Sequence, residues 1–357
     1  MDIKYIQNLT LTRFVCSIIS IFSCLVIVIL YILLCFQLKF QKSLKKEEET
    51  TTFEQTSLSN TESNNEKKVG LGSHYMFLLI LSNLFSALTE GSFYIKLFIF
   101  DKNLIKDLTY YKEFSVSTFC QSYSFFHNFF ELNGVCWTTI ITRLFYYSTK
   151  IIGLGTHKEQ MINSLLFSLG FSIMISILPL FFSGYGFAFT HCSFDKIDDE
   201  KKLKSLFFGS ILTIFIILNC IYNFVVLLKS HYFYKNKIYQ LKEQNENEYE
   251  TLKIYVMLFK LFPFFLLFSR FIKLVQYLVE LIKNLPFTII IYYFNSILYC
   301  LTGLFDSLFC FFFFRGVYKS CCENKDNEFK ENENESETKL VSSLYKEIFD
   351  SLFLEEI

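Results

Sequence analysis

The sequence predicts an all-α membrane protein: a seven-transmembrane helix bundle with its N-terminus outside and its C-terminus in the cytosol. Three observations predict this fold class. Of the 357 residues, 52% are hydrophobic and only 19% are charged, whereas a soluble domain carries about 25% charged residues. The mean hydropathy is +0.35. The chain has only 3 Pro and 12 Gly, which argues for long helices, and its apolar runs are continuous, unlike the alternating strands of a β-barrel.

Seven apolar stretches are each long enough to cross a bilayer, since about 20 helical residues span about 30 Å of hydrocarbon. They cover residues 14–36, 75–98, 119–147, 162–187, 205–228, 252–280 and 287–314. Helices are required because backbone polar groups find no water partner in lipid. We interpret the first stretch as an uncleaved span, since it is longer than the core of a signal peptide, about 7–15 residues. Residues 14–314 therefore form the transmembrane domain.

An odd number of spans places the two termini on opposite faces of the membrane. Lys and Arg number 16 in the odd-numbered connections and the flank of the tail, against 10 on the other side. Because positive residues favour the cytosolic face, we expect residues 1–13 to be a short extracellular N-terminus and residues 315–357 a cytosolic tail. The first inner loop, 37–74, has a polar centre that predicts disorder. At the end of the tail, 340–352 has helical spacing, which predicts either an amphipathic helix or an unstructured segment.

Two of the eleven cysteines occupy positions where oxidation makes topological sense. Cys120 falls at the outer start of the third span, and Cys192 lies in the outer loop between spans four and five. Both face an oxidising compartment, so we predict a disulfide that pins this loop over the bundle, with two free thiols as the alternative. Cys321 and Cys322 follow the last span beside basic residues, a setting that suits palmitoylation. The sequence contains no CxxC pair and no Cys/His cluster with the spacing of a metal site, so we expect no metal or cofactor.

Three segments resemble one receptor family. In the third span, Trp137 follows Cys120 by seventeen residues and Tyr146 follows nine residues later. In the sixth, Arg270 stands in a Ser-Arg-Phe-Ile step, and the seventh contains Gly-Leu-Phe-Asp-Ser from residue 303. Together these segments resemble the cyclic-AMP-receptor-like (class E) family of seven-helix G-protein-coupled receptors. The first inner loop is longer here than in that family.

This resemblance, with the seven spans and the outer cysteines, implies a G-protein-coupled receptor of the plasma membrane. We expect it to sense an extracellular small molecule and to signal to a heterotrimeric G protein. The alternative is a channel or transporter that uses intramembrane charges as an ion path. A light-driven pump is disfavoured, because 287–314 contains no lysine for a retinal Schiff base. We expect no enzyme activity, since motifs of intramembrane catalysis are missing from the spans. The net charge of zero disfavours nucleic acid as a partner.

Ionisable residues within the outer halves of the spans predict the ligand site, because burying a charge in lipid costs at least about 2.5 kcal/mol without a partner or a water-filled cavity. The candidates are Lys96, His127, Glu131, Arg270 and Lys273. Their excess of basic groups would suit an anionic ligand such as a cyclic nucleotide in a pocket open to the outside. Two alternatives stay open: Glu131 neutralises a basic residue inside the bundle, or the two lysines reach to the headgroups.

The inner halves of the spans predict a conformational lock and a surface for the G protein. Lys260 and Asp306 each lie about 12 Å from the inner membrane face, at 1.5 Å per helical residue. An ion pair between them would hold spans six and seven in a resting arrangement, with a static pair as the alternative. Pro263 would make span six the moving element. Arg143 at the inner end of span three would face the G protein, although a positive-inside anchor explains it equally well.

Overall fold

The structure, a computed structural model, describes residues 3–52, 68–69, 71–97, 117–149, 157–182, 184–188, 191–194, 199–242, 294, 297–298, 301–312, 314 and 354–355. Its long helices are α1 (Ile3–Thr52), α2 (Leu71–Ile95), α4 (Thr118–Thr149), α5 (His157–Phe181) and α6 (Asp199–Lys242). A shorter apolar helix covers Leu301–Phe312. The sixth predicted span, 252–280, and most of 287–300 lie outside the described residues.

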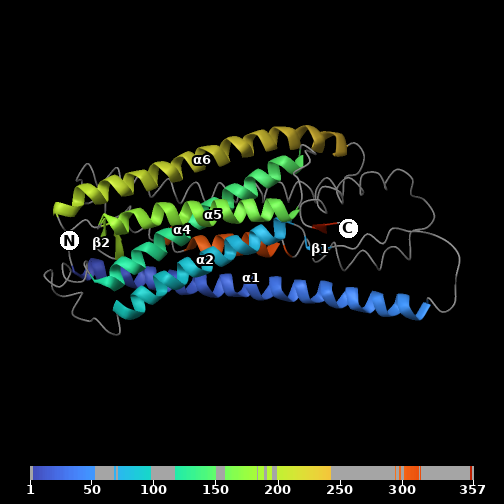
Figure 1. Ribbon diagram of the computed structural model, residues 1–357, viewed down its shortest axis with the longest axis horizontal. Helices are drawn as coiled ribbons and strands as arrows, with labels where there is room; N and C mark the ends of the chain where they lie inside the picture. The colour runs from blue at the N-terminus through green and yellow to red at the C-terminus, as the bar shows by residue number, and fades with distance from the viewer. Residues whose placement is uncertain are drawn as a thin grey trace.

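The helices run side by side along the long axis of the molecule, and consecutive helices run in opposite directions (Figure 1). Strands β2 (Tyr185–Ala188) and β3 (His191–Phe194) form an antiparallel hairpin in which Phe187 pairs with Cys192. This hairpin lies at the end of the bundle where α1 begins. Strands β1 (Lys68–Val69) and β4 (Leu354–Glu355) pair at the other end. The two ends of the chain therefore lie at opposite ends of the bundle.

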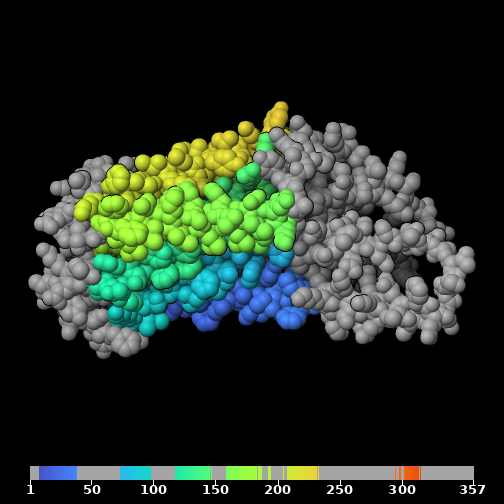
Figure 2. Space-filling view, viewed as in Figure 1, coloured from blue at the N-terminus to red at the C-terminus, as the bar shows by residue number. Residues whose placement is uncertain are grey.

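The described helices expose apolar side chains and bury polar ones, the reverse of a soluble protein. On α1, Phe22 is 66% exposed, whereas Ser17 and Ser20 are each 1% exposed. On α6, Phe207 and Leu218 are exposed by 62% and 61%. Within the described parts of the chain, four helical segments are long and apolar enough to cross a membrane: Asn8–Gln37, Ser73–Ile95, Lys158–Phe181 and Phe207–Ser230. Figure 2 shows α5 and α6 side by side on one face of this elongated body. Such a surface fits hydrocarbon rather than water as its solvent.

Helix α4 is the central helix of the described bundle. It packs against α2, α5, α6 and the hairpin, and residues 131–138 are all buried. Its polar groups face neighbouring helices, as when Ser82 Oγ of α2 donates to the carbonyl of Phe130 at 3.1 Å. Gly134 allows this close approach, because a Cβ there would lie 3.3 Å from Asn83 Oδ1. The position of α4 explains why this helix is less apolar than α2 and α5.

Several helix boundaries differ from those expected; α6, for example, runs from Asp199 to Lys242 rather than from 205 to 228. Helix α1 begins at Ile3 and continues to Thr52, so it includes most of the expected extracellular segment 1–13 and the first part of the polar loop. The sequence contains neither Pro nor Gly from 3 to 52 to end it. Helix α5 ends at Phe181 rather than at 187, close after Pro179. The chain turns there, with the N–H of Gly184 donating to the Pro179 carbonyl at 2.8 Å, and enters the hairpin.

Candidate ligand site

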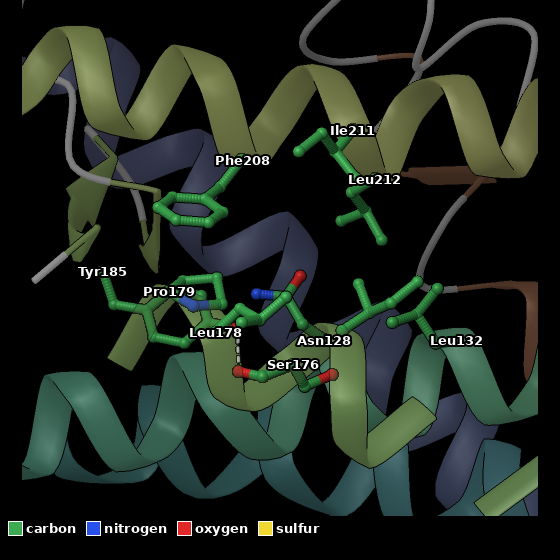
Figure 3. A pocket seen from close by; sticks show the side chains of 10 residues that line it. Asn128, Leu132, Ser176, Leu178, Pro179, Tyr185, Phe208, Ile211 and Leu212 are labelled. Atoms are coloured by element: carbon green, nitrogen blue, oxygen red, sulfur yellow. Dashed lines mark hydrogen bonds between the residues drawn. The ribbon is translucent and has the colours of Figure 1, made fainter. Parts of the chain in front are cut away.

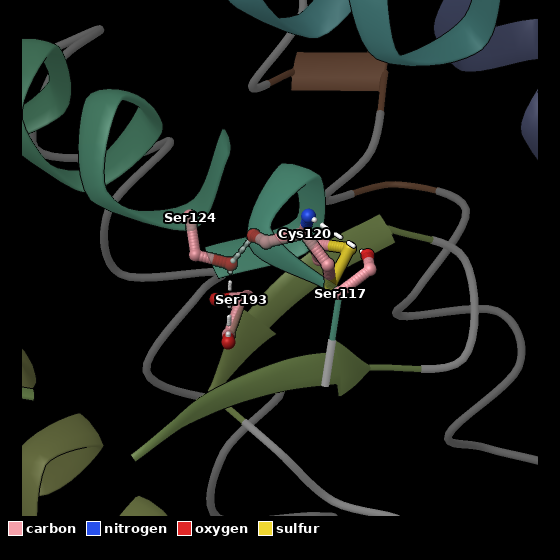
Figure 4. The surroundings of a disulfide bond; sticks show 5 residues. Ser117, Cys120, Ser124 and Ser193 are labelled. Carbon is pink, nitrogen blue, oxygen red and sulfur yellow. Dashed lines mark hydrogen bonds between the residues drawn. A yellow bond between two sulfur atoms is a disulfide. The ribbon is translucent and has the colours of Figure 1, made fainter. Parts of the chain in front are cut away.

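A disulfide joins Cys120 and Cys192, with their Cα atoms 5.3 Å apart and a sequence separation of 72. It fixes the hairpin to the first turn of α4 (Figure 4). Ser117 caps this turn, because its Oγ accepts from the N–H of Cys120 at 3.2 Å. Ser124 Oγ donates to the Cys120 carbonyl at 2.8 Å and approaches that of Ser193 on β3 at 3.4 Å. The disulfide and these hydrogen bonds together hold the hairpin over the end of the bundle.

Close to the disulfide, the carboxylate of Glu90 is the centre of a buried polar cluster, which we call the Glu90 cluster. Glu90 Oε1 lies 2.9 Å from Arg13 Nη2, and Oε2 lies 3.4 Å from His127 Nδ1. Tyr94 donates its hydroxyl hydrogen to Oε1 at 3.1 Å, and Tyr123 donates to Oε2. Arg13, Glu90 and His127 are only 5%, 2% and 3% exposed. The cluster therefore joins α1, α2 and α4 inside the bundle.

The composition of the Glu90 cluster explains how its charges can be buried. A lone carboxylate inside a low-dielectric interior is strongly disfavoured, but an opposite charge and several hydrogen-bond donors offset that cost. Here one guanidinium and two phenol groups meet the two oxygens of Glu90. Aromatic rings enclose the cluster, with the Phe93 and Tyr123 centroids 4.6 Å apart. The arrangement is a preorganised polar site in which one carboxylate faces a guanidinium, an imidazole and two phenol groups.

The structure describes three of the five predicted ligand-binding residues. Lys96 directly follows α2, and its Nζ lies 3.7 Å from the centroid of the Phe119 ring, a cation–π distance. His127 belongs to the Glu90 cluster. Glu131 lies one turn further along α4 and is 3% exposed. Arg270 and Lys273 lie outside the described residues. That these residues bind a ligand stays a prediction.

Asp306, one half of the predicted lock, accepts a hydrogen bond from Asn83 Nδ2 of α2 at 2.5 Å. Around it, the Leu301–Phe312 helix packs tightly against α1. Cys24 Sγ lies 3.7 Å from the Gly303 carbonyl and 3.5 Å from Ser307 Oγ. Lys260, the other half of the lock, lies outside the described residues, so the lock also stays a prediction. Asn83 is a polar contact of Asp306 that the sequence did not reveal.

At the end of α4 opposite the disulfide, Arg143 is exposed, as a contact with a cytosolic partner would require. Cys321 and Cys322, the predicted palmitoylation sites, lie outside the part of the chain that the structure describes. Nothing in the described contacts assigns Arg143 a partner protein. Its role at a G-protein surface therefore stays a prediction.

Sequence analysis missed Arg13, Tyr94 and Tyr123, which all contact Glu90. A signal for the tyrosines was present: Tyr94 lies four residues after Glu90, and Tyr123 four residues before His127, so each pair shares a helix face. Arg13 had been assigned to the extracellular segment. No local sequence pattern pointed to the contact of Arg13, because its partner, Glu90, lies in another helix. The only indication was that the first helix could begin before the most apolar stretch.

Comparisons with known proteins identify the fold. No protein-family model matches the sequence, and no curated protein matches it. Among solved structures, 214 chains match. One of these, the crystal structure of squid rhodopsin, aligns with 94% of this chain and 94% of its own chain, with a TM-score of 0.54 and 15% sequence identity. Together with the apolar helices of the described bundle, this similarity shows that the chain has the seven-helix membrane fold of rhodopsin.

Proposed function

We propose that the protein is a G-protein-coupled receptor of the cyclic-AMP-receptor-like kind. In this proposal it lies in the plasma membrane with its N-terminus outside, senses an anionic, cyclic-nucleotide-like small molecule and signals to a heterotrimeric G protein. The observation that carries the proposal is the buried Glu90 cluster, which lies close to a disulfide-tethered hairpin at the end where α1 begins. The rhodopsin fold supports it, as do the motifs of spans three, six and seven.

Cations near the hairpin favour an anionic ligand. Lys96 is half-buried at the end of α2, against the Phe119 ring at the start of α4. An anion bound there would also attract His127 and Arg13, which Glu90 holds in the described arrangement. A ligand that interacts more strongly with one arrangement of these helices shifts the population toward it. Redistribution of contacts between α1, α2 and α4 is therefore a route from ligand binding to helix movement.

The other end of the bundle would contact the G protein. Arg143 is exposed there, and Asp306 of the Leu301–Phe312 helix contacts Asn83 of α2. A cation such as Arg143 on the cytosolic surface would suit an acidic surface of the G protein. A polar contact between helices, such as that of Asp306, would suit a helix that switches between two arrangements. Palmitoylation of Cys321 and Cys322 would anchor the tail to the membrane nearby.

A channel or transporter fits the described contacts less well. An ion path needs charged groups that face a hydrated route, whereas Arg13, Glu90 and His127 face one another and are at most 5% exposed. Light sensing through a retinal Schiff base would need a lysine in the last span, and 287–314 has none. Flux of ions into liposomes that hold the purified protein would support the channel instead.

Nucleotide exchange on co-expressed G proteins tests the proposal. Membranes containing the protein and a panel of Gα subunits are challenged with cyclic AMP, cyclic GMP and other anionic metabolites. We expect one ligand to stimulate exchange, and Lys96→Ala to raise its half-maximal concentration about tenfold, the effect of about 1.4 kcal/mol. Lys158→Ala is the control, because this lysine is exposed in the first turn of α5, away from the hairpin. Absence of stimulation across the panel, with the protein at the cell surface, would contradict the proposal.

A further inference from the structure

The first turn of α2 differs in charge from the first turns of α5 and α6. From residue 67 the sequence is Lys-Lys-Val-Gly-Leu-Gly-Ser-His, and the helix begins at Leu71. Helix α5 has Glu159 in its first turn and α6 begins with Asp199, whereas the first turn of α2 contains no acidic residue. The N-terminus of a helix presents N–H groups and the positive end of the helix dipole. Two lysines directly before such an end are therefore unfavourable unless an anion lies nearby.

One hydroxyl group in this turn is buried without a hydrogen bond. Ser73 is 0% exposed, and its Oγ has no hydrogen-bond partner among the described residues. Side chains of a helix lean toward its N-terminus, so this Oγ lies over the first turn of α2. Leaving a buried hydroxyl without a partner costs free energy. An anion at the end of the helix would accept the hydrogen of Ser73.

Ser176 of α5 also has an Oγ without a hydrogen bond among the described residues, but its surroundings differ. Ser176 lines a cavity of about 30 Å³ between α4, α5 and α6 (Figure 3). This volume is room for one water molecule, which would satisfy the hydroxyl. Ser176 also lies far from the first turn of its helix. The hydroxyl of Ser73, in contrast, coincides with a helix N-terminus.

Basic residues flank the first turn of α2 from two segments. Lys68 lies in β1, three residues before the helix begins. The Phe314 ring centroid is 5.5 Å from that of Tyr31, whose hydroxyl oxygen lies 2.6 Å from His74 Nδ1. The chain after the Leu301–Phe312 helix therefore passes the start of α2, and Arg315 is the next residue in sequence. Cations from both segments favour an anion with more than one negative charge.

We propose that the first turn of α2 binds a phosphate monoester. Ser73 Oγ and the N–H groups of this turn donate hydrogen bonds to it, and the flanking basic residues neutralise its charge. The membrane span of α2 begins at Ser73, so the site lies at the level of the lipid headgroups. A phosphoinositide headgroup and a soluble phosphate share the required chemistry. The inference depends neither on the ligand proposed near Lys96 nor on coupling to a G protein.

Strand β4 brings an acidic residue to the same place. It pairs with β1, and Glu355 lies directly opposite Lys68. Opposite charges across two strands attract each other, so the carboxylate of Glu355 competes with a phosphate for this lysine. Glu355→Gln should therefore strengthen phosphate binding.

Native mass spectrometry of the purified full-length protein in detergent tests this proposal. The protein is titrated with a short-chain phosphatidylinositol bisphosphate, with the free inositol trisphosphate headgroup and with a short-chain phosphatidylserine, which has no phosphate monoester. We expect the bisphosphate lipid to bind about tenfold more tightly than phosphatidylserine, because a monoester dianion accepts more charged hydrogen bonds. Equally tight binding of the free headgroup would assign the site to a soluble phosphate, and weaker binding would assign it to the lipid. Equal binding of the two lipids would overturn the proposal.

Substitutions separate a built site from general attraction by lysines. Ser73→Ala should weaken binding of the bisphosphate lipid about tenfold, the effect of one hydrogen bond to a charged group. Ser73→Thr keeps the hydroxyl and should keep the affinity. Ser172→Ala, at an equally buried serine within α5, is the matched control. Thermal unfolding shows that each variant is folded.

The charge variants follow the same design. Lys68→Gln should weaken binding about threefold, the size of one charge interaction near a surface. Lys158→Gln, at an exposed lysine in the first turn of α5, should leave it unchanged. Unaltered affinity in Ser73→Ala, or equal losses in the two lysine variants, would overturn the proposal.

Discussion

Glu90 Oε1 of α2 lies 2.9 Å from Arg13 Nη2 of α1, and both side chains are almost fully buried. Neither charge would be stable there alone, because removing an ion from water costs several kcal/mol without a close partner. Tyr94 and Tyr123 supply further donors to the same carboxylate. The first helix of the bundle is thus fixed to the second by a contact between charges rather than by apolar packing alone.

Loss of one charge should destabilise the protein more than loss of both. Arg13→Leu leaves the Glu90 carboxylate without its cation, and we expect a loss of about 3–5 kcal/mol in unfolding free energy. The double variant Arg13→Leu/Glu90→Leu leaves neither charge, so it should be more stable than the single variant. Thermal unfolding in detergent measures both. Glu159→Leu, at an exposed site of α5, is the control, and additive losses in the double variant would contradict the coupling.

The disulfide should contribute about as much to the unfolding free energy as the contact between Arg13 and Glu90. Cys120→Ser and Cys192→Ser each remove the link across 72 residues of sequence, and we expect each to cost about 2–5 kcal/mol. The double variant should cost no more than either single variant, because only one bond is lost. Cys220→Ser, at a half-buried cysteine of α6 that is not part of this disulfide, is the control. Surface expression and thermal unfolding report the effect, and additive losses would argue against the pairing.

The sequence predicted those features that depend on composition and on gross topology. Long apolar runs place α1, α2, α5 and α6, because the bilayer requires length and hydrophobicity, and the outer position of Cys120 and Cys192 predicted their bond. The contacts of Arg13 and Asp306 were not predictable in this way. Each depends on how two helices face each other, and Glu90 and Asn83 come from a helix far along the chain. The β2–β3 hairpin also escaped prediction, because its strands are short and the first one, Tyr185–Ala188, overlaps the apolar stretch 162–187.

Gly303 should tolerate a methyl group poorly. A Cβ at this position would lie 3.1 Å from Ser20 Cβ and 3.2 Å from Cys24 Sγ of α1, so the Leu301–Phe312 helix would have to move away. We expect Gly303→Ala to cost about 1–3 kcal/mol of unfolding free energy. Gly170→Ala is a matched control, because a Cβ there meets nothing within 4 Å, and it should stabilise α5 by up to about 1 kcal/mol. Similar thermal midpoints for the two variants would refute this packing.

The contact of Asp306 with Asn83 leads to a prediction about basal signalling. If a charged Asp306 holds the resting arrangement with Lys260, then Asp306→Asn and Lys260→Met should each raise nucleotide exchange without ligand, about tenfold for a shift of 1.4 kcal/mol. Asn83→Ala removes only a hydrogen bond and should have a smaller effect. Exchange on co-expressed G protein measures all three variants. Unchanged basal exchange in both charge variants, at equal surface expression, would reject the lock.

The two ends of the chain should be accessible from opposite sides of the membrane. The disulfide requires an oxidising compartment at the end of the bundle where α1 begins, and this argument is independent of the distribution of Lys and Arg. An epitope placed before Ile3 should therefore bind antibody on intact cells, whereas one placed after Ile357 should bind only after permeabilisation. A variant whose inner loops carry the opposite charge serves as a positive control, because its two epitopes should be accessible from the reversed sides of the membrane. Both epitopes on one side would contradict the seven crossings, and an exposed C-terminal epitope alone would place the Glu90 cluster on the cytosolic side.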